Sequence, residues 1–243
     1  MAADIRFHKN DLPDLSHYNV DAVAIDTETL GLNPHRDRLC VVQISPGDGS
    51  ADVIQIAPGQ KKAPNLVSLL RDRKVTKLFH FGRFDLAVLY NAFGVMPEPV
   101  FCTKIASRLT RTYTDRHGLK DICNELLGVS LSKAQQSSDW AAETLSPEQL
   151  EYAASDVLYL HRLREVLSTR LARENRTREA DACFRFLPTR AKLDLMGWGE
   201  EDIFAHSRRS GWSPGTRRRQ PAFRRLGIVS GLARSRVACD RRG

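Results

Sequence analysis

Apolar residues in the first part of the chain fall into short runs separated by turn residues, a pattern that predicts strands. Residues 20–25 form an apolar run that is broken only by Asp21, and residues 39–45 and 51–56 form two further runs. Residues 46–49, with the sequence Pro-Gly-Asp-Gly, lie between the last two runs and are typical of a hairpin turn. Three such strands in succession predict a sheet that begins antiparallel.

Further along, the pattern changes from strands to helices. An apolar strand is expected over residues 75–81, and a helix over 83–93 that ends at Gly94. Other helices are expected over residues 65–72, 119–127, 146–173, 177–187 and 189–196. The longest begins with Ser146, followed by a proline and then Gln149, which together predict an N-cap with a capping box. Strands followed by helices predict an α/β or α+β body with a mixed sheet.

The net charge of +8 is concentrated at the end of the chain. Residues 208–243 contain eleven arginines, no lysine and a single acid, whereas the rest of the chain carries 26 basic and 28 acidic residues. The basic character therefore does not indicate that the body binds nucleic acid. We expect a domain over residues 1–206 and, over 207–243, an Arg-rich extension that is disordered or non-native.

Composition also bears on location and on cysteine chemistry. The N-terminus has no basic-then-apolar leader, and no apolar run is long enough to cross a membrane, so we expect a soluble cytoplasmic protein. The cysteines are odd in number and widely spaced, without a Cys-x-x-Cys pair. Neither a zinc site nor a disulfide framework is therefore indicated.

Two carboxylates end the first strand. Residues i and i+2 of a strand point to the same face, so Asp26 and Glu28 are expected to project together. Two acids on one face repel each other unless a cation lies between them. Alone, an Asp-x-Glu pair is also typical of a solvated strand end.

Two later segments supply further acids. Asp85 lies in the first turn of the helix that follows the 75–81 strand, where it could also serve only as a partner of the helix dipole. Tyr152 and Asp156 are four residues apart on the longest helix and therefore share a helix face. Asp156 has no Lys or Arg four residues away, which favours a cation from elsewhere.

In this order, the acids resemble those of the DEDD 3′–5′ exonuclease superfamily, in its tyrosine-bearing branch. Residues 80–89, 135–140 and 152–160 narrow the resemblance to the ribonuclease D family, over residues 20 to about 170. The short chain and the segment from residue 182 to 206 are similar to the nanoribonuclease C group. The resemblance implies a ribonuclease H-like fold with a mixed sheet flanked by helices, and a ring-like homo-oligomer that acts on very short RNA.

The resemblance implies a site whose catalytic residues are Asp26, Glu28, Asp85, Tyr152 and Asp156. The four acids are oxygen ligands that favour Mg²⁺ or Mn²⁺ over zinc, and two such ions would bind both sides of a scissile phosphate. Tyr152, whose ordinary pKa of about 10 makes it a weak base at neutral pH, would orient the attacking water.

Substrate contacts are expected from three further residues, each with an ordinary alternative. Leu32 would wedge against the terminal bases, or simply anchor its loop in the core. His80 would contact the 3′ end, or be a satisfied strand histidine. Lys133 would neutralise a phosphate, or be solvated.

The predicted function is hydrolysis of short single-stranded RNA from a free 3′ end to 5′-mononucleotides. Two alternatives use the same fold: 3′ trimming of longer RNA such as tRNA, and 3′–5′ degradation of DNA. A third is a binding module without activity, which the presence of all four acids and the tyrosine disfavours.

Overall fold

The computed structural model describes residues 3–132, 135, 138–198 and 203–204 of the 243-residue chain. Its strands are β1 (Asp4–Lys9), β2 (Ala22–Thr29), β3 (Leu39–Ser45), β4 (Ser50–Gln55), β5 (Thr76–Phe79) and β6 (Val100–Cys102). Its helices are η1 (Ser16–Tyr18), α1 (Pro64–Arg71), α2 (Arg83–Phe93), α3 (Thr103–Thr110), α4 (Leu119–Leu127), α5 (Pro147–Leu158), α6 (Leu160–Arg173), α7 (Thr177–Leu193) and η2 (Asp194–Trp198).

The chain divides into a unit of residues 1–203 and a second unit of residues 204–243. All of the strands and helices given above belong to the first unit. The predicted Arg-rich extension over residues 207–243 lies outside the described residues.

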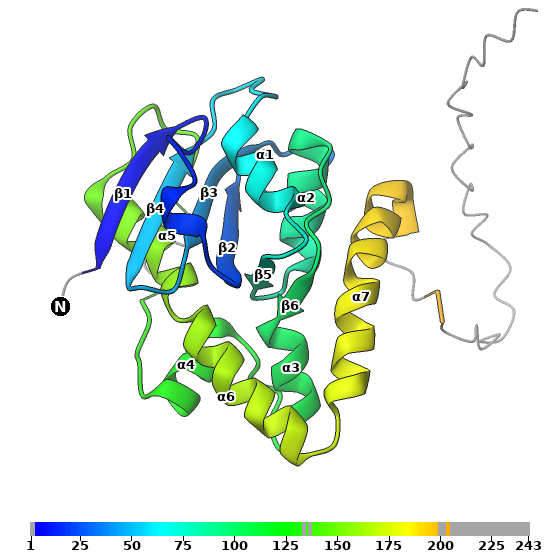
Figure 1. Ribbon diagram of the computed structural model, residues 1–243. Helices are drawn as coiled ribbons and strands as arrows, with labels where there is room; N and C mark the ends of the chain where they lie inside the picture. The colour runs from blue at the N-terminus through cyan, green and yellow to red at the C-terminus, as the bar shows by residue number, and fades with distance from the viewer. Residues whose placement is uncertain (1–2, 133–134, 136–137, 199–202, 205–243) are drawn as a thin grey trace, which may run out of the picture. The chain divides into compact units, whose positions relative to one another are not determined.

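All six strands form one mixed sheet in the order β1-β4-β3-β2-β5-β6. β3 runs antiparallel to its neighbours β2 and β4, while the pairs β1–β4, β2–β5 and β5–β6 are parallel. The predicted antiparallel start is therefore confirmed for the three strands that the sequence indicated. Figure 1 shows the sheet with α5 behind β1 and β4.

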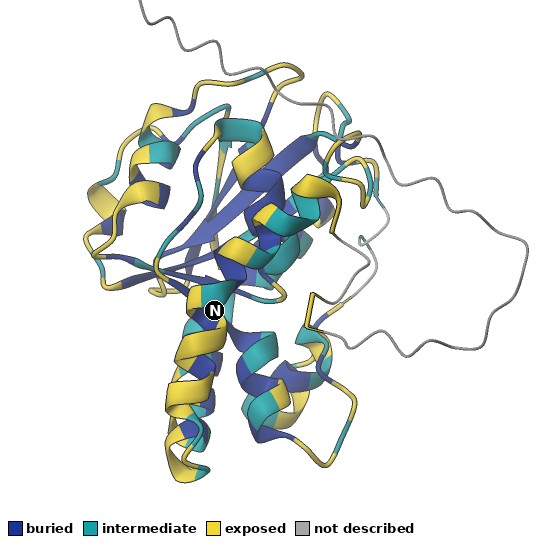
Figure 2. Cartoon of the chain, turned by 90° about the vertical axis from the view of Figure 1, so that its right-hand side faces the viewer, coloured by how far each residue is buried: buried dark blue, intermediate teal, exposed yellow. Residues whose placement is uncertain are grey.

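The middle of the sheet is covered on both faces. Every residue of β3 is buried, and so are the first four of β2. Strands buried on both faces carry continuous apolar runs, which explains why these two segments stood out in the sequence. Figure 2 shows the buried strands flanked by helices whose outward positions are exposed. The mixed sheet between helices confirms the predicted fold class.

Two strands, β1 and β6, were not predicted, and one predicted strand is shorter than expected. β1 lies at the edge of the sheet and has no buried position, so it lacks the apolar run that would have indicated a strand. β6 has only three residues, too few for a periodic signal. β5 ends at Phe79 rather than at residue 81, since Phe81 has a φ of 65°, outside the range of a strand.

The longest predicted helix, over residues 146–173, is two helices. α5 ends at Leu158 and α6 begins at Leu160, with Tyr159 at φ −105° and ψ −4° between them. α5 packs on strands β1 to β4, whereas α6 packs mainly on α3, α4 and α7, so a change of direction lets each helix cover a different surface. No proline or glycine marks the change, and the sequence alone therefore did not reveal it. The capping box of Ser146 and Gln149 is confirmed.

The predicted end of a helix at residue 187 is wrong. α7 continues through Pro188 to Leu193 and absorbs most of the separate helix expected over residues 189–196. Ala180, Phe184, Leu187, Pro188 and Ala191 are all buried, at spacings that place them on one face of α7. The packing of this face compensates for the backbone hydrogen bond that proline removes.

Two other observations concern the described residues as a group. None of their helices combines the length and the apolar character that crossing a membrane requires. Their four cysteines are free thiols, three of them buried.

Candidate active site

Three of the predicted acids converge at the middle of the sheet. β2 carries Asp26 and Glu28, and α5, which packs across β2 and β3, carries Asp156. One carboxylate oxygen from each residue lies within 4.8 Å of the other two. β2 therefore supplies two acids on one face of the sheet, as the two-residue repeat of a strand predicts, and α5 supplies the third.

Asp85, the fourth predicted acid, lies beside this group without being part of the same 4.8 Å cluster. It is in the first turn of α2 and only 4% exposed. Its Oδ1 accepts a 2.7 Å hydrogen bond from the hydroxyl of Thr27, the residue between the two acids of β2. Thr27 therefore holds the Asp85 carboxylate against the strand.

The pKa values of all four acids are raised, and burial is the largest cause in each case. Burial, followed by repulsion from Asp85 and Asp156, holds the pKa of Asp26 well above its usual range. Burial and the same two neighbours raise the pKa of Glu28 to about 8. The pKa values of Asp85 and Asp156 rise to about 7, chiefly through burial. Such a group of acids is poorly stabilised by the protein alone.

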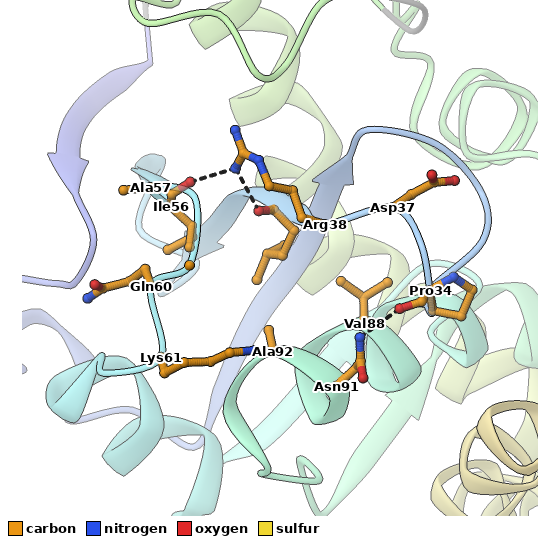
Figure 3. Close-up of a pocket in the computed structure, with 12 residues that line it drawn as sticks. Pro34, Asp37, Arg38, Ile56, Ala57, Gln60, Lys61, Val88, Asn91 and Ala92 are labelled. Atoms are coloured by element: carbon orange, nitrogen blue, oxygen red, sulfur yellow. Dashed lines mark hydrogen bonds between the residues drawn. The ribbon is translucent and has the colours of Figure 1, made fainter.

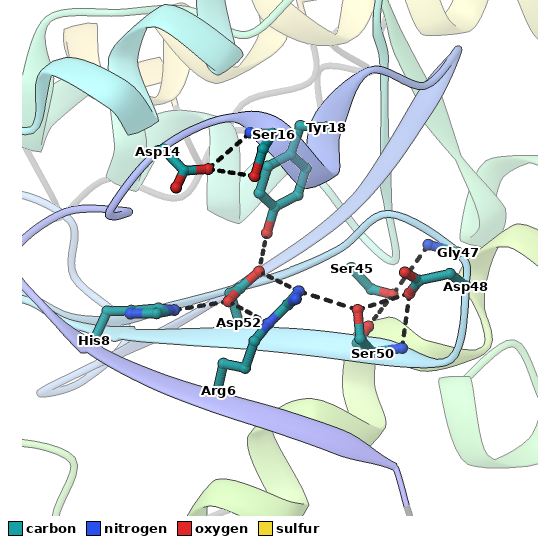
Figure 4. Close-up of polar contacts among 10 residues, drawn as sticks. All are labelled: Arg6, His8, Asp14, Ser16, Tyr18, Ser45, Gly47, Asp48, Ser50 and Asp52. Atoms are coloured by element: carbon teal, nitrogen blue, oxygen red, sulfur yellow. Dashed lines mark hydrogen bonds and ion pairs between the residues drawn. The ribbon is translucent and has the colours of Figure 1, made fainter.

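Asp52 is a buried acid outside this group, and its contacts show how this chain stabilises a carboxylate that has a structural role. Asp52 on β4 is held by Arg6 through two hydrogen bonds of 2.9 Å, by Nε2 of His8 at 2.7 Å, and by the hydroxyl of Tyr18 (Figure 4). By contrast, none of the ion pairs among the described residues involves Asp26, Glu28, Asp85 or Asp156. The four acids therefore have no basic ion-pair partner among the described residues, an arrangement that favours binding of a cation from outside the chain.

The donor set fits a hard divalent cation. All the converging atoms are carboxylate oxygens, the ligands that Mg²⁺ and Mn²⁺ prefer, and the described residues offer no cysteine or histidine in the same cluster. Repulsion among the acids is the force that such a cation would relieve. Asp26, Glu28 and Asp156 are therefore the residues that could hold it, with Asp85 close enough to repel Asp26.

Tyr152 lies one helical turn before Asp156 on α5. Burial and the negative charge of Asp156 raise the pKa of the Tyr152 phenol, so this side chain stays protonated at neutral pH. Its ring is 6.0 Å, centroid to centroid, from the ring of Trp140, which is only 3% exposed. A protonated phenol held by a buried aromatic side chain can donate a hydrogen bond, but it cannot act as a general base.

The three predicted substrate contacts have different outcomes. Leu32 is 86% exposed, so the alternative that it anchors its loop in the core is wrong. His80 places Nδ1 at 2.9 Å from the hydroxyl of Thr103, and burial lowers its pKa to about 3, which keeps the ring neutral. Lys133 lies outside the described residues.

The loop that carries Leu32 is fastened to its surroundings beside a small pocket of about 90 Å³ (Figure 3). Nδ2 of Asn91, on α2, donates a 2.7 Å hydrogen bond to the carbonyl of Pro34. Arg38 donates to the carbonyls of Ile56, at 2.9 Å, and Leu39, at 3.1 Å. None of the four candidate acids lines this pocket, and its contacts serve to hold the loop.

Gln43 and Thr27 are neighbours of the acids that sequence reasoning missed. Gln43 lies directly opposite Asp26 in the register of β2 and β3, and its Nε2 is 3.3 Å from Oδ2 of Asp26. A signal was available, because Gln43 is the polar residue in an otherwise apolar run from Leu39 to Ile44. Thr27 gave no such signal, since threonine is common in strands.

The chain is similar to several known proteins. A family model described as 3′–5′ exonuclease matches residues 14–172. The ribonuclease D of Gluconacetobacter diazotrophicus is 38% identical over 154 residues, which cover 63% of this chain and 39% of that protein. That of Xanthomonas oryzae is 33% identical over 170 residues, covering 70% and 46%. The chain thus spans less than half the length of these relatives.

Solved structures extend the likeness. The Brucella melitensis NrnC structure has 79% sequence identity and a TM-score of 0.83, over 84% of this chain and 99% of that one. The same protein has been solved bound to pGG and with bound Mg²⁺. Escherichia coli RNase D, an exoribonuclease involved in structured RNA processing, has 29% identity and a TM-score of 0.65, over 73% and 46%. The chain belongs to the 3′–5′ exonuclease family, in the group that contains ribonuclease D and NrnC.

Proposed function

We propose that this protein is a divalent-metal-dependent 3′–5′ exoribonuclease that hydrolyses short oligoribonucleotides to 5′-mononucleotides. The observation that carries the proposal is the convergence of Asp26, Glu28 and Asp156 within 4.8 Å, with no ion-pair partner among the described residues. The NrnC structure bound to pGG, at 78% identity, supports a short substrate over a long one.

The residues support a division of roles. Asp26, Glu28 and Asp156, with Asp85 beside them, would hold Mg²⁺ or Mn²⁺, and the NrnC structure with bound Mg²⁺ supports magnesium. When bound, such ions supply positive charge that activates water and stabilises the reacting phosphate. Tyr152 keeps its proton and would donate it in a hydrogen bond that orients the attacking water.

Substrate recognition would use the Leu32 loop. Leu32 follows Glu28 by four residues in sequence, and its exposed side chain offers an apolar surface on which the last base of a short RNA can rest. His80 is neutral and already bonded to Thr103, which supports a role in holding the strand end more than a role in charge recognition. Lys133 remains a candidate for contact with phosphate.

The experiment uses 5′-labelled RNA with Mg²⁺, as a dinucleotide and as a much longer single strand, resolved over time. Faster loss of the dinucleotide is the expected result. Equal cleavage of the long strand in a descending ladder would instead indicate a general 3′ trimming enzyme, and preference for a DNA strand would indicate a deoxyribonuclease. Binding without cleavage by the metal-loaded protein would identify a binding module.

We also propose that the protein is a cytoplasmic homo-oligomer in which residues 1–206 suffice for activity. The extension over residues 207–243 differs from the rest of the chain in composition, which supports its being dispensable. Light scattering on the purified full chain tests the oligomer, and cell fractionation tests the location. A chain that ends at residue 206 should hydrolyse the dinucleotide at the rate of the full chain. A large loss would show that the extension contributes.

A further inference from the structure

Gln43 is a fully buried amide next to the candidate metal site. It lies at the centre of the all-buried strand β3, directly opposite Asp26 on β2. Its Nε2 donates a 3.3 Å hydrogen bond to Oδ2 of Asp26. Its Oε1 has no hydrogen-bond partner, although almost every buried polar atom in a protein has one. The amide therefore uses its donor on Asp26 and leaves its acceptor unpaired.

The fold alone does not explain an amide at this position. The neighbours of Gln43 along β3, Val42 and Ile44, are fully buried apolar side chains. A methionine or leucine of similar size would bury apolar surface there without an unpaired acceptor, whose loss of hydration destabilises the folded state. What the amide provides instead is one directional hydrogen bond to a carboxylate.

A second buried polar atom without a hydrogen-bond partner belongs to Trp140, whose ring lies next to the candidate site residue Tyr152. Across the described part of the chain, the buried side-chain nitrogen and oxygen atoms without a partner are Oε1 of Gln43 and Nε1 of Trp140. Trp140 packs with Val41, two residues before Gln43 on the same face of β3, and its ring lies against Tyr152. Among the described residues, both buried side-chain atoms without a partner thus lie close to a candidate site residue, where a polar group can serve a ligand rather than the fold.

We propose that Gln43 is a positioning residue for Asp26, which it holds in the orientation that a divalent cation requires. By donating to Oδ2, the amide fixes the rotation of the Asp26 carboxylate before a cation arrives. Partners that orient metal-ligating carboxylates in this way set the affinity of the site without touching the cation. The inference rests on the proposed function only in its assumption that the acids bind a divalent cation.

The test replaces the amide with an apolar side chain of similar size, Gln43→Met, and measures Mn²⁺ binding to the full chain by calorimetry. The dissociation constant for Mn²⁺ should rise about 10- to 100-fold. The melting temperature of the metal-free protein should stay the same or rise, because the unpaired acceptor is gone. A merely structural glutamine would give the reverse: lower metal-free stability and unchanged affinity for Mn²⁺.

Gln55→Met is the matched control. Gln55 lies on the adjacent strand β4, and its Nε2 donates a 2.8 Å hydrogen bond to the carbonyl of Ala142 rather than to an acid. This variant should bind Mn²⁺ as the unmodified protein does. Gln43→Leu repeats the test with a different shape. If both Gln43 variants fail to fold without metal, the amide is needed for the fold itself and the proposal is overturned.

The outcome is independent of whether the substrate is RNA. Weaker Mn²⁺ binding by Gln43→Met supports the positioning role even if the unmodified protein cleaves no RNA. Unchanged Mn²⁺ binding overturns it even if RNA is cleaved. If the unmodified protein binds no Mn²⁺ at all, both the metal site and the role of Gln43 are wrong.

Discussion

The hydroxyl of Thr27 donates a buried 2.7 Å hydrogen bond to Oδ1 of Asp85, which joins the central strand to the first turn of α2. The two residues are 58 positions apart in sequence. Thr27 sits between Asp26 and Glu28, so one strand carries two of the candidate acids and also orients a third. This contact indicates that the residue between the acids contributes to the site.

Replacing Thr27 with valine removes the hydroxyl and keeps the shape of the side chain. Because Asp85 then loses the hydrogen bond from the Thr27 hydroxyl, we expect kcat on a dinucleotide to fall about 10- to 100-fold. The free energy of unfolding should fall by about 1 to 3 kcal/mol, because a buried acceptor loses its donor. Steady-state kinetics and denaturant unfolding measure the two effects.

Thr110→Val is the control for that variant. Thr110 is also buried, but its hydroxyl donates at 2.8 Å to the backbone carbonyl of Ala106 within α3. Its loss should leave kcat unchanged. If Thr27→Val retains full activity, the contact with Asp85 has no part in catalysis.

The pKa values of the site acids predict how the metal-free protein responds to pH. Asp85 and Asp156 have pKa values of about 7 and Glu28 of about 8, all above the values near 4 of an unfolded chain. The folded state therefore holds extra protons between about pH 4 and pH 8, and its stability falls as the pH rises through that range.

Thermal melts with a chelator at about pH 6.5 and about pH 8.5 measure this effect. One pKa unit corresponds to about 1.4 kcal/mol, so we expect the melting temperature to drop by at least about 3 °C. The drop should shrink in Asp156→Asn and disappear when Mg²⁺ is added. A melting temperature that rises over this interval would contradict the predicted charge state of the acids.

The Asp52 network should matter for stability and not for metal binding. Asp52→Asn leaves Arg6 and His8 without the carboxylate that they share, and breaking such a buried pair destabilises a protein by about 3 kcal/mol. Denaturant unfolding checks the loss. Mn²⁺ affinity below the unfolding transition should match that of the unmodified protein, and a weaker affinity would show that the network also supports the site.

Leu32 should affect substrate binding without affecting stability. Because its side chain is 86% exposed, Leu32→Ala removes no core packing, and the melting temperature should not change. If the side chain supports a terminal base, KM for a dinucleotide should rise about tenfold, equivalent to about 1.4 kcal/mol of contact. Met196→Ala, at a methionine that is 71% exposed, is the control and should leave KM unchanged.

The parts of the fold that the sequence predicted correctly are those with a local signal. The runs at 39–45 and 83–93 became β3 and α2 with the expected bounds, because a fully buried strand and a helix that ends at glycine are visible in the residues themselves. The change of helix at Tyr159 and the continuation through Pro188 depend on packing against distant elements. Such packing overrides local preference and leaves no local signal.

The same distinction applies to the site. Strand and helix periods place Asp26, Glu28 and Asp156 on defined faces, and it was the order of the acids along the chain, which resembles that of the DEDD exonucleases, that selected them. That Asp85 bonds to Thr27 rather than joining the tightest cluster could not be predicted, since the direction of a side chain in a first helical turn depends on its tertiary neighbours. The role of Gln43 emerged only once the register opposite Asp26 was known.

The hydrogen bond from Asn91 to the carbonyl of Pro34 has a consequence for substrate placement. Asn91 lies six residues after Asp85 on the same helix, a rise of about 9 Å along α2. The loop with Leu32 is therefore anchored at a constant offset from a candidate catalytic acid. If Leu32 supports the last base of the bound RNA, the distance of that base from Asp85 is set by α2, and adding one helical turn between Asp85 and Asn91 would move the base out of register with the acids.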